Sequence, residues 1–270
     1  MNTLPTRFRI TSVHQLWAWL RRRDGLQQIL VVVAGLEVYE VCRHFIDPNW
    51  PAAMANAERV VNLERWAGFA YEQSIQRAFL DVPELVQAMN AFYFLGHFFL
   101  TGVFFLWLYF RSRDGYRSFR NGFLVATAIA LVIHWKFPTA PPRLADAGIE
   151  DTLQAMANID IGSRRTSSYS NPVAAVPSLH AGWAVGVGIG IWRYAKNPAV
   201  RAFAALYPVA VILTIVVTGN HFIFDAVAGI LVMAIGFMVS HAVLERRRRR
   251  QESSEHGAIL ADATRGGAVR

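Results

Sequence analysis

The sequence predicts an all-α polytopic membrane protein, a bundle of six transmembrane helices with one further helix on the membrane surface. Hydrophobic residues make up 54% of the 270 residues and charged residues only 17%, and the mean hydropathy is positive. The apolar residues also gather in runs long enough to cross about 30 Å of hydrocarbon as helices. Soluble domains are more polar and have shorter apolar runs, so this composition excludes them.

The apolar runs define six expected spans. The first is the most polar, because Glu37, Glu40 and Arg43 interrupt it at helical spacings that allow them to pair or to face the bundle interior. In the fourth span, Gly182 and Gly186 fall on one face, which lets a neighbouring helix approach closely. The expected spans cover residues 26–46, 91–110, 122–137, 179–194, 202–219 and 222–244.

The distribution of basic residues predicts the orientation of the chain in a cell membrane. Lys and Arg accumulate before the first span, in the short connections and in the run 246–250, as cytoplasmic segments do. We therefore expect a cytoplasmic N-terminal segment (1–25), a membrane catalytic domain (26–244) and a basic, disordered cytoplasmic tail (245–270). The net charge of +8 then reflects topology and contact with anionic lipids at the cytoplasmic face, and no nucleic acid partner is expected.

Two long connections are expected on the outer side. In the first, Val60, Leu63, Ala67 and Ala70 share one face of a predicted helix, whose amphipathic character places it on the membrane surface. The second, residues 138–177, contains several Pro, Gly, Ser and Asn residues and no span. It is expected to form an outer loop that acts as a lid or as part of the substrate site.

Three polar clusters lie at the ends of apolar runs, at 136–143, 177–180 and 221–225. The expected threading brings all three to the outer face. Ionisable side chains at the rim of a span are costly unless they are used, so this convergence predicts an active site on the extracytoplasmic side.

The third cluster offers a nucleophile. His221 and Asp225 are four residues apart, so the carboxylate can accept a proton from one ring nitrogen and leave the other nitrogen free to attack. An equally good interpretation of this pair alone is the stabilisation of a helix end.

The other two clusters offer groups that bind an anion. Ser178 caps a predicted helix and His180 stands in its first turn, where unpaired amides favour an anion and a histidine can protonate a leaving oxygen. Lys136 and Arg143 supply two cations for phosphate oxygens. Taken singly, Ser178 is more often only a cap, and Lys136 can simply extend to the membrane interface.

Together these groups predict phosphoryl transfer. The cations and amides hold the phosphate, His221 attacks phosphorus and His180 protonates the departing alcohol. The chain shows no nucleotide-binding fingerprint and no convincing metal-ligand spacing, so neither a cofactor nor a metal is expected.

The ordered motifs resemble the three-part signature of the type-2 phosphatidic acid phosphatase superfamily. The Pro-Pro-Arg ending at Arg143, the Pro-Ser-Leu-His ending at His180 and the Thr-Gly-Asn-His ending at His221 are most similar to the inositol phosphorylceramide synthase branch. The resemblance covers roughly residues 91–244. It implies that His221 is the nucleophile, that His180 is the general acid and that Asp225 orients His221. It also implies that Lys136, Arg143 and Ser178 bind the phosphate.

The sequence departs from this signature at two places. Leu179 stands where the family has Gly, and Thr214 and Ile215 stand where it has Ser-Arg. The missing arginine removes an expected phosphate ligand, for which Arg164 or Arg165 of the outer loop can substitute. Solvated loop charges are the alternative interpretation of that pair.

We therefore expect an enzyme that takes a lipid phosphate from the outer leaflet and transfers its phosphoryl or phospho-alcohol group through a phosphohistidine. The branch resemblance favours an alcohol acceptor such as inositol, a phosphotransfer; the alternative is hydrolysis of a phosphatidate or of a polyprenyl phosphate or diphosphate. Two further alternatives are a transporter, suggested by the charges of the first span, and an inactive scaffold, suggested by the missing arginine.

Overall fold

The computed structural model describes residues 23–44, 49–145, 147–157 and 173–266. Within these ranges the chain is all-α, as predicted, and the one β contact is an isolated parallel bridge between Thr139 and Ala174. The helices are α2 (Arg23–His44), α3 (Trp50–Ala67), α4 (Glu72–Leu80), α5 (Pro83–Ala91), the π-helix η1 (Phe92–Gly96), α6 (His97–Arg111), α7 (Arg113–Lys136), α8 (Thr152–Ala157), α9 (Leu179–Tyr194), α10 (Pro198–Val217) and α11 (Ile223–Gly266).

Four helical segments are long and apolar enough to cross a membrane. They are Pro83–Arg111, Arg113–Lys136, Pro198–Val217 and Ile223–Arg246. Helices also occupy the other two expected spans, but α9 has only 16 residues, about 24 Å of helix, and α2 carries several charges. The chain is an integral membrane protein, and the count of six spans remains a prediction.

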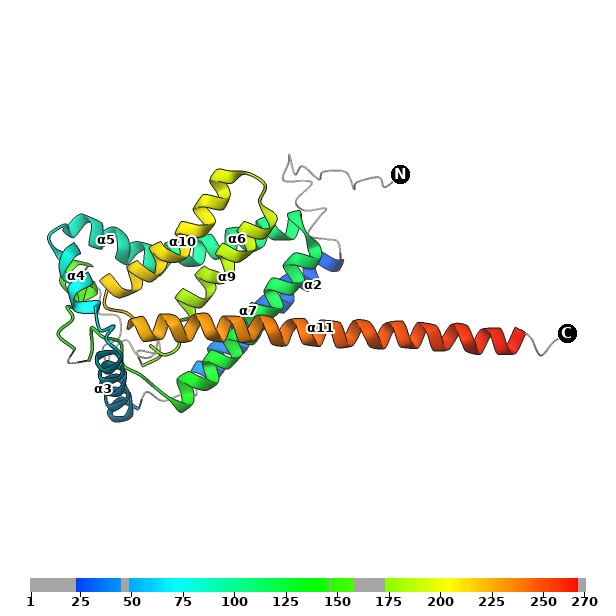
Figure 1. The fold of residues 1–270 in the computed structure, drawn as a ribbon, viewed down its shortest axis with the longest axis horizontal. Helices are drawn as coiled ribbons and strands as arrows, with labels where there is room; N and C mark the ends of the chain where they lie inside the picture. Colours follow the sequence, from blue (N-terminus) through cyan, green and yellow to red (C-terminus); the bar gives the residue numbers. More distant parts are fainter. Residues whose placement is uncertain (1–22, 45–48, 146, 158–172, 267–270) are drawn as a thin grey trace.

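Several helix boundaries differ from those expected, and α7, for example, begins at Arg113 instead of residue 122. The second span begins at Pro83, because proline is well suited to the first position of a helix, and α5, η1 and α6 run on without a break. The last helix, α11, continues to Gly266 instead of ending near residue 244, so residues that we expected to be disordered are helical (Figure 1).

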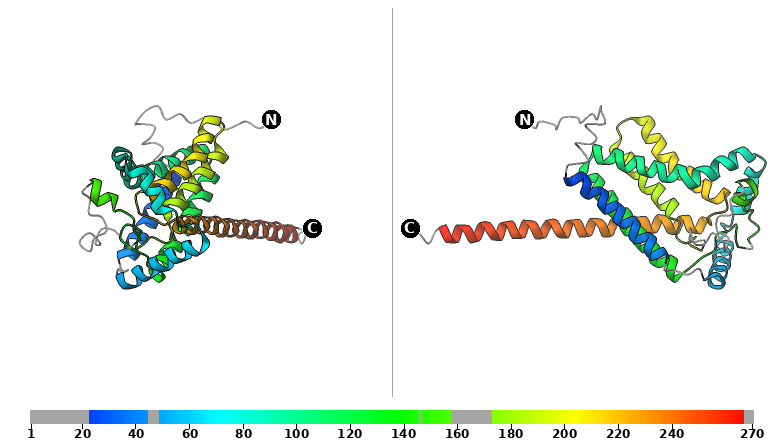
Figure 2. Two further views of the ribbon diagram at one scale, coloured as in Figure 1. Left: turned by 60° about the vertical axis from the view of Figure 1, so that its left-hand side comes forward. Right: turned by 180° about the vertical axis from the view of Figure 1, so that it is seen from behind.

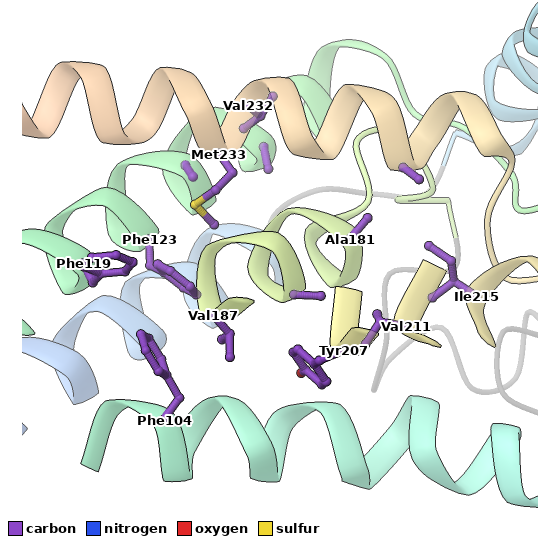
Figure 3. Close-up of a cluster of buried hydrophobic side chains, with 14 of the residues drawn as sticks. Phe104, Phe119, Phe123, Ala181, Val187, Tyr207, Val211, Ile215, Val232 and Met233 are labelled. Atoms are coloured by element: carbon purple, nitrogen blue, oxygen red, sulfur yellow. The ribbon is translucent and has the colours of Figure 1, made fainter. Parts of the chain in front are cut away.

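Helix α9 lies in the middle of the bundle. It packs against α6, α7, α10 and α11, and α11 also packs along α7 (Figures 1 and 2). Figure 3 shows how apolar side chains from these helices meet around α9, among them Phe104, Phe123, Val187, Val211 and Met233. Membrane helices associate through such close packing, because lipid tails are as apolar as the side chains.

The contact between α9 and α11 depends on glycine. A Cβ atom added at Gly182 would lie 2.6 Å from the Gly229 carbonyl oxygen. A Cβ at Gly229 would overlap the Ser178 carbonyl group. The glycine spacing of the fourth span thus permits the close approach that we predicted, and this approach brings the start of α9 onto the first turns of α11.

Helix α3 buries one face against the protein and leaves much of its predicted apolar face exposed. Its buried residues include Ala57, Val60 and Glu64, whereas Leu63 is 40% exposed and Ala67 is exposed as well. Ala53, Ala57 and Val60 pack in a small cluster with Phe222, just before α11. On the same side of α3, the Glu64 carboxyl group accepts a hydrogen bond from the start of α11, as described below. The position of α3 on a membrane surface remains a prediction.

Helix α2 packs along α7 and leaves Glu37 exposed. Glu37 therefore does not face the bundle interior, and pairing among these charges stays a prediction, because the side chains of Glu40 and Arg43 lie outside the described residues. Glu37 is exposed because α2 lies outside the cluster of helices around α9, where one of its sides has no helical neighbour (Figure 2).

Candidate active site

The geometry of His221 defines which ring nitrogen is free. Its Nδ1 lies 3.3 Å from Oδ2 of Asp225 and 3.0 Å from the carbonyl oxygen of Ala175. A carbonyl oxygen can only accept a hydrogen bond, so Nδ1 carries the proton and Nε2 keeps its lone pair. This is the tautomer that a nucleophilic histidine needs.

The backbone before α11 sets the position of His221. The residue lies two positions before the first residue of the helix, Ile223. Gly219, with a φ of 68°, makes the tight turn that ends α10. The amides of Asn220 and His221 both donate to the carbonyl oxygen of Ile215, at 3.0 and 3.1 Å. The nucleophile is thereby fixed to the end of one helix and the start of the next.

His180 lies beside His221. The centroids of the two rings are 5.8 Å apart, with an interplanar angle of 52°. The His180 ring stacks on Tyr93 of the π-helix η1, at 4.3 Å and 19°, and π-helical turns are often found at functional sites. Its Nε2 is buried and has no hydrogen-bond partner among the described residues. The structure thus brings together the two histidines on which the sequence argument depended.

Ser178 is buried in the contact between α9 and α11. Its Oγ accepts a hydrogen bond from the Ala181 amide at 3.4 Å, which makes it the N-cap of α9, and its own amide donates to the Asp225 carbonyl oxygen at 2.9 Å. The cap interpretation is confirmed. A phosphate-binding role for Ser178 remains a prediction.

Arg143 lies against the turn that carries His221. Its Nε donates to Oδ1 of Asn220 at 3.0 Å, its amide donates to the Gly219 carbonyl oxygen at 3.0 Å, and its Nη1 pairs with Oδ2 of Asp151 at 3.1 Å. The guanidinium side chain is only 6% exposed. The sequence argument had missed Asp151, which has no motif around it.

Lys136 is not turned toward these groups. It is the last residue of α7, its side chain is exposed, and its ammonium nitrogen lies 3.8 Å from the centroid of the Trp135 ring. That position matches the alternative of a lysine at the membrane interface. The other two expected cations, Arg164 and Arg165, lie outside the described residues.

A comparison with known protein families identifies the family in which this arrangement of histidines occurs. The family model of the PAP2 superfamily matches residues 58–239, well over half of the chain and all three polar clusters. The chain belongs to the PAP2 superfamily. No curated protein and no solved structure matches the chain significantly.

Membership in the PAP2 superfamily makes the chain a lipid phosphatase or phosphotransferase. The matched segment contains α6, α7, α9, α10 and the first part of α11, which are the helices that meet around the site. The membrane helices therefore agree with the enzyme class.

At the position of the missing PAP2 arginine, the chain has an apolar residue that packs in the protein core. Ile215 is fully buried in the cluster around α9, and Thr214 beside it is 4% exposed. An apolar residue is compatible with this position because its carbonyl oxygen, not its side chain, contacts the nucleophile's turn.

Two of the histidines outside the motifs make structural hydrogen bonds. Nδ1 of His97 lies 2.8 Å from the Tyr207 hydroxyl, and Nε2 of His134 lies 3.2 Å from the Pro177 carbonyl oxygen. His97 also lies 5.0 Å from His180, centroid to centroid, so it forms one wall around the second histidine of the PAP2 site.

The sequence argument missed two buried glutamates. Glu72 accepts a hydrogen bond from the Ile223 amide at 2.8 Å, and Glu64 accepts one from the Phe224 amide at 2.7 Å. Both carboxyl groups therefore lie at the first turn of α11, next to the PAP2 nucleophile. One signal was available, because the stripe of Ala53, Ala57 and Val60 on α3 continues to Glu64, and a carboxyl group on a buried stripe needs a partner.

Proposed function

We propose that the chain transfers a phosphoryl or phospho-alcohol group from a membrane lipid phosphate to an alcohol such as inositol, through a phosphohistidine at His221. The observation that carries the proposal is the pair of rings 5.8 Å apart, one of which has its tautomer fixed by Asp225 and Ala175. The proposed site faces the extracytoplasmic side, both termini lie in the cytoplasm, and the basic segments contact anionic lipids there.

In the first step, Nε2 of His221 forms a bond to phosphorus as the bond from phosphorus to the lipid oxygen breaks. His180 gives a proton to that oxygen, so the lipid leaves as a neutral alcohol. Asp225 stabilises the positive ring that results. In the second step the acceptor hydroxyl loses its proton to His180 and attacks phosphorus, and the bond to His221 breaks.

Arg143 is the phosphate ligand best supported by the structure, because it is held beside the residue that precedes His221. A planar guanidinium suits two phosphate oxygens at once. Lys136 can bind the phosphate only after its ammonium group leaves the Trp135 ring. Ser178 can bind it only by donating its hydroxyl proton, because its oxygen already accepts a hydrogen bond as the N-cap of α9.

The family match favours an enzyme over the transporter alternative, and Glu37, one of the charges that suggested a transporter, is exposed on α2. The alternative that remains within the family is hydrolysis, in which water takes the place of the alcohol acceptor in the second step.

The test uses the purified full-length protein in mixed micelles with a lipid whose phosphate is labelled with ³²P, with and without inositol. We expect acid-labile label on the wild-type protein, none on His221→Ala, and a labelled inositol phosphate product that appears only with inositol. Release of labelled phosphate at the same rate with or without inositol would show hydrolysis instead. Wild-type turnover by His221→Ala would overturn the mechanism itself.

A further inference from the structure

Three consecutive amides at the start of α11 are each bound by a different carboxyl group. The Phe222 amide donates to Asp225 at 2.9 Å, and the next two amides donate to Glu72 and Glu64. The three acidic side chains are almost completely buried, with exposed fractions of 0% for Asp225, 6% for Glu72 and 1% for Glu64. The last two come from α3 and α4, the pair of helices next to the start of α11 in Figures 1 and 2.

The two glutamates are also joined to each other. Their side chains share a hydrogen bond, which two ionised carboxylates cannot form because neither has a proton to donate. Burial raises the pKa of the Glu64 carboxyl from 4.5 to about 8, and the charge of Glu72 adds to the rise. At neutral pH, therefore, the Glu64 carboxyl is the neutral acid and can donate to Glu72.

We propose that Glu72, assisted by Glu64, is a positioning residue for the nucleophile: it holds the first turn of α11 and places a second negative charge behind the His221–Asp225 pair. The inference rests on the proposed function, because it concerns the same reacting histidine. Glu72 interacts electrostatically with Asp225, and Asp225 touches the ring nitrogen that carries the proton. Neither glutamate is proposed to contact the substrate.

The chemical effect follows from where charge appears. The His221 ring is neutral before attack and positive once phosphorus is bound to Nε2. A fixed negative charge in a site with little water stabilises the second state more than the first. Glu72 should therefore act on the rate of turnover and not on the binding of the lipid. A purely structural cap, in contrast, needs only an oxygen that accepts the Ile223 amide, and glutamine has one.

The two glutamates thus predict an asymmetric result with glutamine. Glu64→Gln keeps an acceptor for the Phe224 amide and a donor for Glu72, so we expect wild-type kcat and KM. Glu72→Gln keeps the amide contact but loses the charge, so we expect kcat to fall about tenfold with KM unchanged. Glu58→Gln is the matched control, because Glu58 makes the same charge change on the exposed face of α3 and should leave both constants unchanged.

Each variant is assayed as full-length protein with the labelled lipid, and its thermal unfolding is measured beside it. Equal kcat for Glu64→Gln and Glu72→Gln would overturn the inference, as would a change confined to KM. Failure of Glu72→Gln to fold would overturn it too, since a structural role would then be sufficient. If Glu72→Gln behaves as wild type while His221→Ala is inactive, only this inference fails; if His221→Ala is active, the proposed function fails with it.

Discussion

At the scale of single residues, one group that orients the His221 ring is neutral and the other is charged. The Ala175 carbonyl oxygen and the Asp225 carboxylate both accept the Nδ1 proton of His221, but only the carboxylate carries charge. His180, in contrast, is held by rings: Tyr93 stacks on it, and the Phe98 ring meets it edge-on at 5.3 Å. The motif spacing was enough to predict both histidines. The rings that hold His180 were not predicted, because aromatic residues at the end of a span are common.

The role of His180 can be tested through the leaving group. If it protonates the departing oxygen, His180→Gln should lower kcat by roughly 10²–10⁴ with an alkyl lipid phosphate. An aryl phosphate analogue has a leaving group that needs no proton, so the loss there should be less than about tenfold. Steady-state kinetics with the two substrates measure the difference.

His241→Gln is a suitable control, because His241 is an exposed histidine near the other end of the membrane portion of α11, paired with Glu245 at 3.3 Å. Equal losses with both leaving groups for His180→Gln would contradict the acid role and indicate that the histidine only shapes the site.

At the scale of elements, the glycine contact between α9 and α11 determines the distance between the two histidines. His180 belongs to the first turn of α9, and His221 lies two residues before the first residue of α11, Ile223. Apolar length predicted where these helices lie, and glycine spacing predicted that α9 packs closely. Neither feature predicted the carboxyl groups at the start of α11, because that contact joins residues 72 and 223, which are 151 positions apart.

Gly229→Ala should disturb both stability and activity. The added Cβ would overlap the Ser178 carbonyl group, and overpacking of this kind costs about 1–3 kcal/mol. A displacement of about 1 Å between reacting groups lowers the rate by roughly 10²-fold. The measurements are thermal unfolding in detergent and kcat with the labelled lipid.

Gly102→Ala provides the control for this change. Nothing lies within 4 Å of a Cβ at Gly102, in α6, so the replacement should be neutral or stabilising, by up to about 1 kcal/mol. Comparable losses of activity in the two variants would show that the contact between α9 and α11 is not special.

Glu64 should make stability depend on pH in a defined direction. Its pKa is raised from 4.5 to about 8 in the folded protein, so the folded state holds a proton that the unfolded state has released. The stabilisation linked to this proton is complete below pH 4.5 and is lost as the pH rises to about 8.

Glu64→Gln removes this dependence because glutamine does not titrate. The unfolding temperature of the variant relative to wild type should therefore increase between pH 5 and pH 8, by on the order of 10 °C. Thermal scans at several pH values measure it. A difference that stays constant, or that decreases with pH, would contradict the assignment of a neutral Glu64.

At the scale of the whole molecule, one end of the helical bundle carries the candidate site. The start of α9, the end of α10, the start of α11 and the outer helices α3 and α4 all meet there, and α11 extends away from the bundle in the opposite direction (Figure 1). The positions of basic residues predict that this end faces away from the cytoplasm. Composition was sufficient to predict a membrane protein. It did not predict the length of α11, because a polar helix beyond a span has no apolar pattern.

The orientation can be measured with single cysteines. In a Cys42→Ser background, Glu58→Cys on α3 should react with a membrane-impermeant maleimide in intact cells, and Glu245→Cys on α11 should react only after permeabilisation. Both glutamates are exposed, so access depends on the side of the membrane alone. The cysteine-free chain gives the background, and the reverse pattern would place the site in the cytoplasm.

The main-chain acceptor on His221 has an implication for how the enzyme tolerates change. Every amino acid has a carbonyl oxygen, so no codon at position 175 can delete the lone pair that the ring nitrogen meets there. A substitution of Asp225 would then slow catalysis, but the His221 ring would keep its orientation, because the Ala175 carbonyl oxygen would still accept its Nδ1 proton. An enzyme with a correctly oriented His221 but a low rate can regain that rate through a later mutation. Such substitutions therefore lower the rate without abolishing the reaction.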